Sequence, residues 1–92
     1  MSELRQTVTI VNKRGLHARA SAKFVGAVAD LPETMTVQVA KDGNVAGGAS
    51  ILGLMMLGAA KGDTVELIVS GDEADNVLAQ LAALVEDGFG EE

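Results

Sequence analysis

The sequence has no cysteine, no tryptophan and no tyrosine. Without cysteine the chain can form neither a disulfide nor a thiolate metal site, and it has no thiol nucleophile. No apolar run approaches the roughly 20 residues that a membrane-spanning helix needs, and the N-terminus shows no apolar signal stretch. We therefore expect a cytoplasmic protein, away from any membrane, whose core is built from aliphatic side chains.

Basic residues are also scarce, since seven Lys and Arg stand against thirteen Asp and Glu and the net charge is −6. Such a charge argues against nucleic acid as a general partner. Residues 1–24 nevertheless hold five basic residues and one acid, whereas residues 62–92 hold nine acids and no Lys or Arg. The single histidine, His17, lies inside the basic stretch, which favours an anion site there. The alternative is that the two stretches are merely solvated faces of opposite charge.

The order of periodic segments predicts an α+β fold in one domain. Alternating apolar residues predict strands over 7–12, 34–40, 44–47 and 64–70. Helical spacing predicts helices over 18–29, 50–57 and from about residue 72 to residue 85. Asp42-Gly43 is typical of a two-residue hairpin. This βαββαβα order predicts an open-faced sandwich, a four-stranded antiparallel sheet with three helices on one face. Residues 88–92 are expected to form a frayed tail.

His17 immediately precedes the helix predicted over 18–29, at the cap position where backbone N–H groups lack helical partners. The N–H groups of Ala18 and Arg19 can therefore contribute to an anion site. The helix dipole also disfavours an imidazolium, so the ring stays neutral and nucleophilic. Arg19 opposes the dipole in the first turn, and a phosphoryl group on His17 would compensate its charge. The alternative is a histidine that only caps the helix.

Other chemistry at His17 is poorly supported by the sequence. There is no second histidine, and no acid is close to His17 along the chain, so neither a metal site nor a serine-histidine-acid triad is expected. The helix that follows is expected to bury the stripe formed by Ala18, Ala22, Val25 and Val28 or Ala29.

The segment S-I-L-G-L-M-M-L at residues 50–57 is apolar nearly all round, which is typical of a buried helix or of a docking surface. We expect Leu54 and Leu57 to face the sheet. The residues expected to face outward and bind partners are Ile51, Leu52 and Met55. Ser50 is a candidate N-cap, and its phosphorylation would place negative charge beside this surface. The alternative is that all these apolar side chains belong to the core.

Two motifs resemble one known family. Residues 15–24, G-L-H-A-R-A-S-A-K-F, resemble the phosphorylation-site motif of HPr, the histidine-containing phosphocarrier family of the phosphoenolpyruvate-dependent phosphotransferase system. Residues 49–58, A-S-I-L-G-L-M-M-L-G, resemble the regulatory serine segment of the same family, and the resemblance covers nearly the whole chain. It implies a single phosphocarrier domain over residues 1–92 that is not an enzyme by itself, since each transfer needs a partner protein. Nothing in the sequence demands a cofactor, a metal or more than a monomer.

The resemblance also implies partners. The phosphoryl group would come from phosphoenolpyruvate through enzyme I, sit on a ring nitrogen of His17 with assistance from Arg19, and pass to an enzyme IIA. Ser50 matches the serine that a dedicated kinase phosphorylates in many relatives, and a matching phosphorylase would reverse that step. The outward-facing residues match the docking positions of the family: Ile51, Leu52 and Met55.

The chain departs from the usual pattern at Ala20, where most relatives have proline after the motif arginine. This departure bears on rate and partner preference rather than on the reaction, because proline is tolerated but not required in a first helical turn. The G-L-M-M-L-G run and the F-G-E ending resemble nitrogen-related branches of the family, which makes a nitrogen-related enzyme IIA a candidate acceptor.

Two other functions stay open on the sequence. The chain could be a regulatory binding module that works through Ser50 and the apolar helix, with His17 only a cap. It could also be a small-molecule-binding α+β regulatory domain, although the sequence shows no cluster of polar residues that would converge in an apolar cleft. Replacing His17 would separate the phosphocarrier from both.

Overall fold

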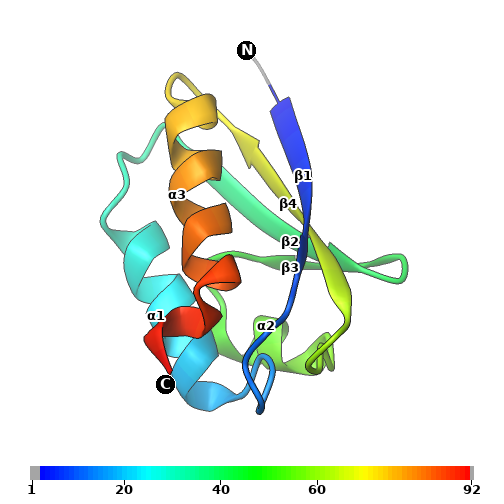
Figure 1. Cartoon of the computed structure of the whole chain (residues 1–92). Helices are drawn as coiled ribbons and strands as arrows, with labels where there is room; N and C mark the ends of the chain where they lie inside the picture. Colours follow the sequence, from blue (N-terminus) through cyan, green and yellow to red (C-terminus); the bar gives the residue numbers. More distant parts are fainter. Residues whose placement is uncertain (1–2, 92) are drawn as a thin grey trace.

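The computed structural model describes residues 3–91, and its element order confirms the βαββαβα prediction. The strands are β1 (Glu3–Thr9), β2 (Thr36–Lys41), β3 (Asn44–Gly47) and β4 (Thr64–Ser70). The helices are α1 (Ala18–Ala29), α2 (Ile51–Met56) and α3 (Ala74–Glu86), followed by a 3-10 turn, η1 (Gly88–Gly90). Figure 1 shows α1 and α3 packed over one face of the sheet, with α2 near its lower end.

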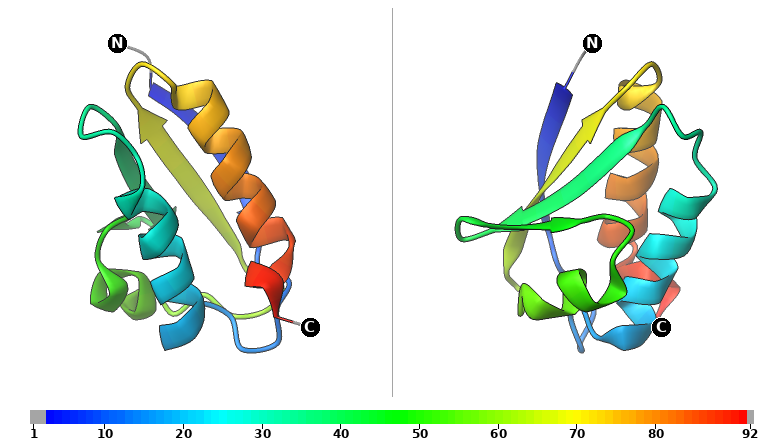
Figure 2. Two further views of the ribbon diagram at one scale, coloured as in Figure 1. Left: turned by 90° about the vertical axis from the view of Figure 1, so that its left-hand side faces the viewer. Right: turned by 180° about the vertical axis from the view of Figure 1, so that it is seen from behind.

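The sheet has the strand order β1-β4-β2-β3, and every neighbouring pair is antiparallel. Directly opposed residues share a face of the sheet, and the opposed pairs Val8–Val65, Leu67–Val39 and Val69–Val37 all point toward the helices. The other face carries exposed polar residues, among them Arg5, which forms an ion pair with Glu66 at 3.1 Å. The right-hand view of Figure 2 shows the helices on one side of the sheet only, which leaves the other face open. The predicted open-faced sandwich is therefore confirmed.

The β2–β3 connection is the two-residue hairpin that Asp42-Gly43 predicts. Lys41 pairs with Asn44 across the turn, and both central residues have positive φ, 53° for Asp42 and 85° for Gly43. That backbone matches a type I′ turn, whose twist suits the flanking strands.

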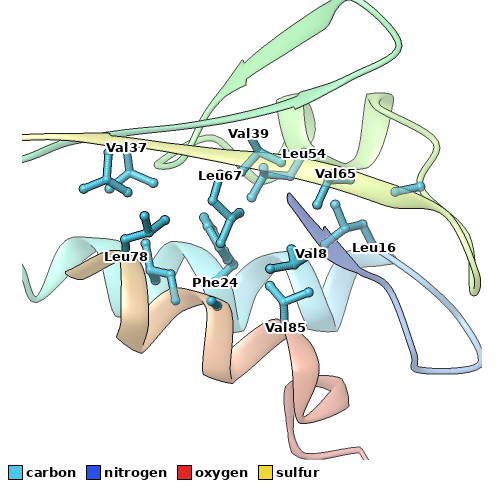
Figure 3. Packing of buried hydrophobic residues seen from close by; sticks show 14 of the residues in the cluster. Val8, Leu16, Phe24, Val37, Val39, Leu54, Val65, Leu67, Leu78 and Val85 are labelled. Atoms are coloured by element: carbon cyan, nitrogen blue, oxygen red, sulfur yellow. The ribbon is translucent and has the colours of Figure 1, made fainter. Parts of the chain in front are cut away.

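The core lies between the sheet and the helices (Figure 3). It is mainly aliphatic, as predicted, and it also contains both phenylalanines, Phe24 and Phe89, which are 1% and 0% exposed. An apolar gap of about 10 Å³ lies among core side chains such as Leu16, Leu54 and Val85. This gap is at the lower limit of the space that one water molecule needs. The observed packing therefore gives no support to the alternative of a small-molecule pocket in the core.

Two predictions about local structure were wrong in detail. The first strand runs over Glu3–Thr9 rather than 7–12, because its first half pairs with the end of β4 and its ladder ends where the turn before β4 begins. The fully buried residues of α1 are Ala20, Ser21 and Phe24, whereas Ala18 and Ala22 of the predicted stripe are exposed. Val25 and Val28 of that stripe pack against the core and are partly buried. The bulky Phe24 ring gains more by burial than alanine does, so it decides which face of the helix turns inward.

The expectation of a frayed tail does not describe residues 88–91. Phe89 is fully buried, and Lys23 donates a hydrogen bond from Nζ to the Phe89 carbonyl oxygen at 2.7 Å. Gly88, Phe89 and Gly90 all have left-handed backbones, with φ of 68°, 59° and 73°. The flanking glycines make this turn accessible, and the buried ring anchors it. Residue 92 lies outside the described residues.

Within residues 3–91, no helix is long and apolar enough to cross a membrane. The segment η1 packs against α1, and Glu91, which follows it, contacts His17 at the start of that helix. Figure 1 shows the chain end next to the start of α1. This juxtaposition brings the acidic end of the sequence to the basic stretch that contains the histidine.

Candidate functional site: a histidine at the start of a helix

His17 is the N-cap of α1, as the sequence predicts. Its backbone is extended, with φ −76° and ψ −179°, and its carbonyl oxygen accepts the N–H of Ser21 at 2.9 Å. Its side chain reaches the first turn as well, because ring atom Nδ1 accepts the N–H of Arg19 at 3.3 Å. The imidazole is 21% exposed, so it is held by the fold and remains open to a partner.

The two residues before His17 fix the loop that carries it. Gly15 has φ +63°, and a Cβ atom at this position would lie 2.2 Å from the carbonyl oxygen of Ala59. Leu16 is buried, and its N–H donates to the same oxygen at 3.0 Å. The G-L-H motif therefore combines a close backbone approach, a core anchor and a cap, and it ties the β1–α1 loop to the segment that follows α2.

The second ring nitrogen of His17 contacts an acid from the other end of the chain. Nε2 lies 2.6 Å from Oε2 of Glu91, 74 residues away in sequence. Asn12 donates from Nδ2 to the other carboxylate oxygen, Oε1, at 3.0 Å, and also to the carbonyl oxygen of Gly15 at 2.8 Å. Asn12 is buried, and its Oδ1 has no hydrogen-bond partner among residues 3–91.

Neither Asn12 nor Glu91 is predicted from the sequence. The available signal was Phe89, a large apolar residue in an otherwise polar and glycine-rich ending, since such a residue tends to be buried. Burial of Phe89 brings Glu91, two residues later, to the wall of the site.

The contacts of the ring define its tautomer. Because Nδ1 accepts an N–H, it carries a lone pair, and the ring proton therefore lies on Nε2 and is donated to the Glu91 carboxylate. The hydrogen bond with His17 lowers the pKa of Glu91 below its usual value, and partial burial opposes this shift. The bond from Asn12 and the charges of His17, when it is protonated, and of Arg19 also lower the pKa of Glu91. A neutral imidazole with its Nδ1 lone pair at a helix start is the arrangement that nucleophilic chemistry requires.

A surface depression surrounds the ring. Its lining residues are Lys13, Arg14, His17, Arg19, Lys23, Gly90 and Glu91. Four cationic side chains and the N–H groups of the first helical turn thus meet in one place, which favours a small anion such as a phosphoryl group. Among the residues that the structure describes, no group of three or more potential ligand side chains is arranged to hold a metal ion.

Ser50 lies outside this depression, at the start of α2. It is the N-cap, as predicted, and its Oγ accepts the N–H of Gly53 at 2.9 Å. Leu54 is fully buried and Leu57 is partly buried against the core. The side chains predicted to face outward are exposed, at 40% for Ile51, 67% for Leu52 and 40% for Met55, and Met56, which is not among the predicted residues, is 77% exposed. Their role as a docking surface stays a prediction.

Comparison with known proteins gives matches over nearly the whole chain. A family model described as "PTS HPr component phosphorylation site" matches residues 4–87. Phosphocarrier protein HPr of Neisseria meningitidis is 42% identical over 88 residues, which are 96% of this chain and 97% of that protein. Phosphocarrier protein NPr of Shewanella violacea is 38% identical over 91 residues, covering 99% of this chain and 98% of the relative. A crystal structure of HPr from Thermoanaerobacter tengcongensis superposes with a TM-score of 0.86 at 38% identity, covering 100% of this chain and 99% of the other.

Proposed function

The chain belongs to the HPr family of phosphocarrier proteins of the phosphotransferase system, and from this membership we propose that it carries a phosphoryl group on His17. The group would come from phosphoenolpyruvate through enzyme I and would pass to an enzyme IIA. The G-L-M-M-L-G run makes a nitrogen-related enzyme IIA the first acceptor to test.

The proposal rests mainly on one observation, the Nδ1 atom of His17 at the N-terminus of α1. This nitrogen carries a lone pair, and Arg19 donates its N–H to it over a long 3.3 Å. Hydrogen bonds of this length are weak, so an incoming phosphoryl group can replace this one. Its oxygens would then accept the N–H groups of the first turn, including those of Ala18 and Arg19.

The transfer step involves only the exchange of one bond to phosphorus. The Nδ1 lone pair attacks the phosphorus atom, and the bond from phosphorus to its donor atom on enzyme I breaks, with the electron pair leaving on the donor. The His17 ring keeps its Nε2 proton and becomes positively charged, because it has gained a bond and lost nothing. The reverse exchange with enzyme IIA restores the neutral ring.

The cationic side chains of the depression would stabilise the charge of the bound group. Arg19 stands in the first helical turn and is exposed, where its planar fork can hold phosphoryl oxygens. Lys13 and Arg14 line the same depression and would add positive potential. Lys23 is engaged with the Phe89 carbonyl, so its contribution would come mainly through its field.

The exposed face of α2, formed by Ile51, Leu52, Met55 and Met56, is proposed as the docking surface for enzyme I and enzyme IIA. Exposed aliphatic and methionine side chains of this kind suit recognition of more than one partner. A serine kinase could regulate docking at Ser50, and a phosphorylase could reverse it. The added charge would suit the helix N-terminus, so α2 would stay folded while its docking face became more anionic.

The protein in this scheme is a substrate of its partners rather than an enzyme, works as a monomer in the cytoplasm, and needs neither cofactor nor metal. Its membership in the HPr family supports the role of a phosphocarrier that depends on partner proteins. A regulatory module that acts only through Ser50 and α2 is the second candidate, favoured by the exposed apolar face beside an exposed serine.

The decisive experiment incubates the protein with phosphoenolpyruvate and enzyme I from the same organism and then measures its intact mass. Wild type should gain one acid-labile phosphoryl group, and His17→Ala should gain none. If His17→Ala gained a phosphoryl group, the acceptor would be a residue other than His17. No gain by wild type, with an enzyme I that phosphorylates another carrier in parallel, would favour the regulatory module.

A further inference from the structure

We propose that Glu91 is a positioning residue for phosphoryl transfer and acts through His17. Its carboxylate holds the ring proton on Nε2, which leaves the lone pair on Nδ1 and turned toward the start of α1. The consequence for transfer rests on the function proposed above, whereas the effect on the ring proton can be measured in the free protein.

The first support is the geometry of the ring. Nε2 and Oε2 are 2.6 Å apart, slightly shorter than the usual N–H···O separation, so a proton must lie between the two atoms. The other nitrogen accepts the Arg19 N–H. A proton on Nδ1 would set two donors against each other and would leave the carboxylate facing a lone pair. The two contacts therefore select the same tautomer.

The second support is that the carboxylate is itself held in place. Asn12 donates to its Oε1 at 3.0 Å from a buried side chain. The turn before it is fixed by the buried Phe89 ring and by the Lys23 bond to the Phe89 carbonyl. Phe89 adopts φ 59°, a left-handed backbone that is unfavourable for a bulky residue. Such strain persists where the surroundings impose it, commonly at functional sites.

The third support is charge. A neutral ring that gains a phosphoryl group on Nδ1 becomes a cation that still carries its proton on Nε2. The Glu91 carboxylate then faces a positive ring, while Arg19 and the helix N-terminus face the negative phosphoryl group. The ring thus lies between an anion on one side and positive groups on the other, and no proton has to move in either transfer.

The test is to measure the ring tautomer by 15N NMR of labelled protein at a pH where the imidazole is neutral. In wild type Nδ1 should give the signal of an unprotonated nitrogen and Nε2 that of a protonated one. In Glu91→Ala the two signals should move toward each other, since both tautomers become populated. Glu91→Gln should keep most of the wild-type pattern, because its amide oxygen can still accept the Nε2 proton. Glu86→Ala, which removes an exposed acid from the end of α3, is the matched control for net charge.

The same variants are then compared in the rate of phosphoryl transfer from enzyme I. Loss of one charge-assisted hydrogen bond predicts a rate roughly 10- to 100-fold lower for Glu91→Ala, with Glu91→Gln in between and Glu86→Ala unchanged. Circular dichroism and thermal unfolding verify that each variant is folded.

The ring signals test whether Glu91 controls the tautomer, and the transfer rates test its positioning role. Identical ring signals in wild type and folded Glu91→Ala would overturn the inference, whatever the transfer rates. A changed tautomer with an unchanged transfer rate would also overturn the positioning role. A wild type with the expected signals that enzyme I from the same organism does not phosphorylate would refute the proposed function and leave the control of the ring proton by Glu91 standing.

Discussion

Two helices of this protein begin in the same way and in very different surroundings. The α1 helix begins at His17 and the α2 helix begins at Ser50, and each side chain accepts an N–H from its own first turn. The imidazole of His17 is only 21% exposed and lies among four cationic side chains and one carboxylate. Ser50 is exposed, and the residues that follow it are apolar.

The comparison teaches that a cap by itself does not define a site. Both helices begin with a side-chain cap, and their surroundings differ because other segments of the chain pack beside them. At α1 these are the β1–α1 loop and the residues after α3, whereas α2 faces solvent with exposed apolar side chains. Substitutions that exchange or remove the residues at one helix start should show which of them its function needs.

The largest effect is expected when the caps are exchanged. His17→Ser keeps an oxygen that can cap α1, yet it should abolish phosphoryl acceptance from enzyme I completely, because serine has no nitrogen lone pair to replace that of imidazole. A second variant, His17→Ser combined with Ser50→His, should also accept nothing, since its histidine lacks the cations around position 17. Intact mass after incubation with enzyme I and phosphoenolpyruvate measures both.

The exchange has a clear contrary outcome. If the combined variant accepted a phosphoryl group, any histidine at a helix start would suffice as acceptor. The cations around position 17 would then not be required. Far-ultraviolet circular dichroism is the control that both variants keep their helices.

The next effect concerns the cation beside the histidine. Arg19→Ala should lower the rate of transfer to His17 by roughly 10- to 100-fold, since a charged hydrogen-bond donor to the phosphoryl oxygens is lost. Arg19→Lys should recover part of the rate, because lysine restores the charge without the planar fork. Rapid-quench kinetics with phosphorylated enzyme I measures the rate.

The control for Arg19 is Lys61→Ala, which removes an exposed cation that lies in the turn before β4 and does not line the depression. An equal loss of rate in Lys61→Ala would show that general charge, and not the position of Arg19, controls transfer.

The smallest effects are expected at Ser50. Ser50→Ala should lower the free energy of unfolding by about 1 kcal/mol, because the Gly53 N–H loses its cap. Ser50→Asp and Ser50→Asn should retain most of that stability, since both residues cap helices well. Urea denaturation followed by circular dichroism measures the differences.

The same variants separate charge from capping in partner binding. Ser50→Asp should slow transfer to or from a partner whose surface is acidic, whereas the neutral Ser50→Asn should not. Leu52→Asp, which places a carboxylate on the exposed face itself, should weaken docking as well. If all three variants transferred the phosphoryl group at the wild-type rate, α2 would be excluded from the docking surface.

Much of the fold was predictable from the sequence because its signals are local. The bounds of α1, β3 and β4 follow from periodicity and from the turn residues beside them. The buried face of α1 was predicted only in part. The helix carries several alanines of similar size, and which of them is buried depends on the packing of Phe24 in the core. The end of the chain was mispredicted for a related reason, because burial of Phe89 is decided by tertiary packing.

Only the part of the site that lies at helix starts was predictable from the sequence. His17, Arg19 and Ser50 lie at helix starts, which the sequence marks with a change of period. Glu91 meets His17 and Asn12 only because the sheet and α3 return the end of the chain to the β1–α1 loop. No spacing rule connects residues 74 positions apart, so a sequence shows such a partner only after the topology is known.

The position of η1 has a practical consequence for labelling and fusion. Glu91 lines the depression around His17, so a tag, linker or further domain attached beyond it would leave from the rim of the site and cross the path of an approaching partner. The start of β1 lies toward the opposite end of the molecule (Figure 1). A fluorophore or affinity handle introduced on that side can report on partner encounters without obstructing them.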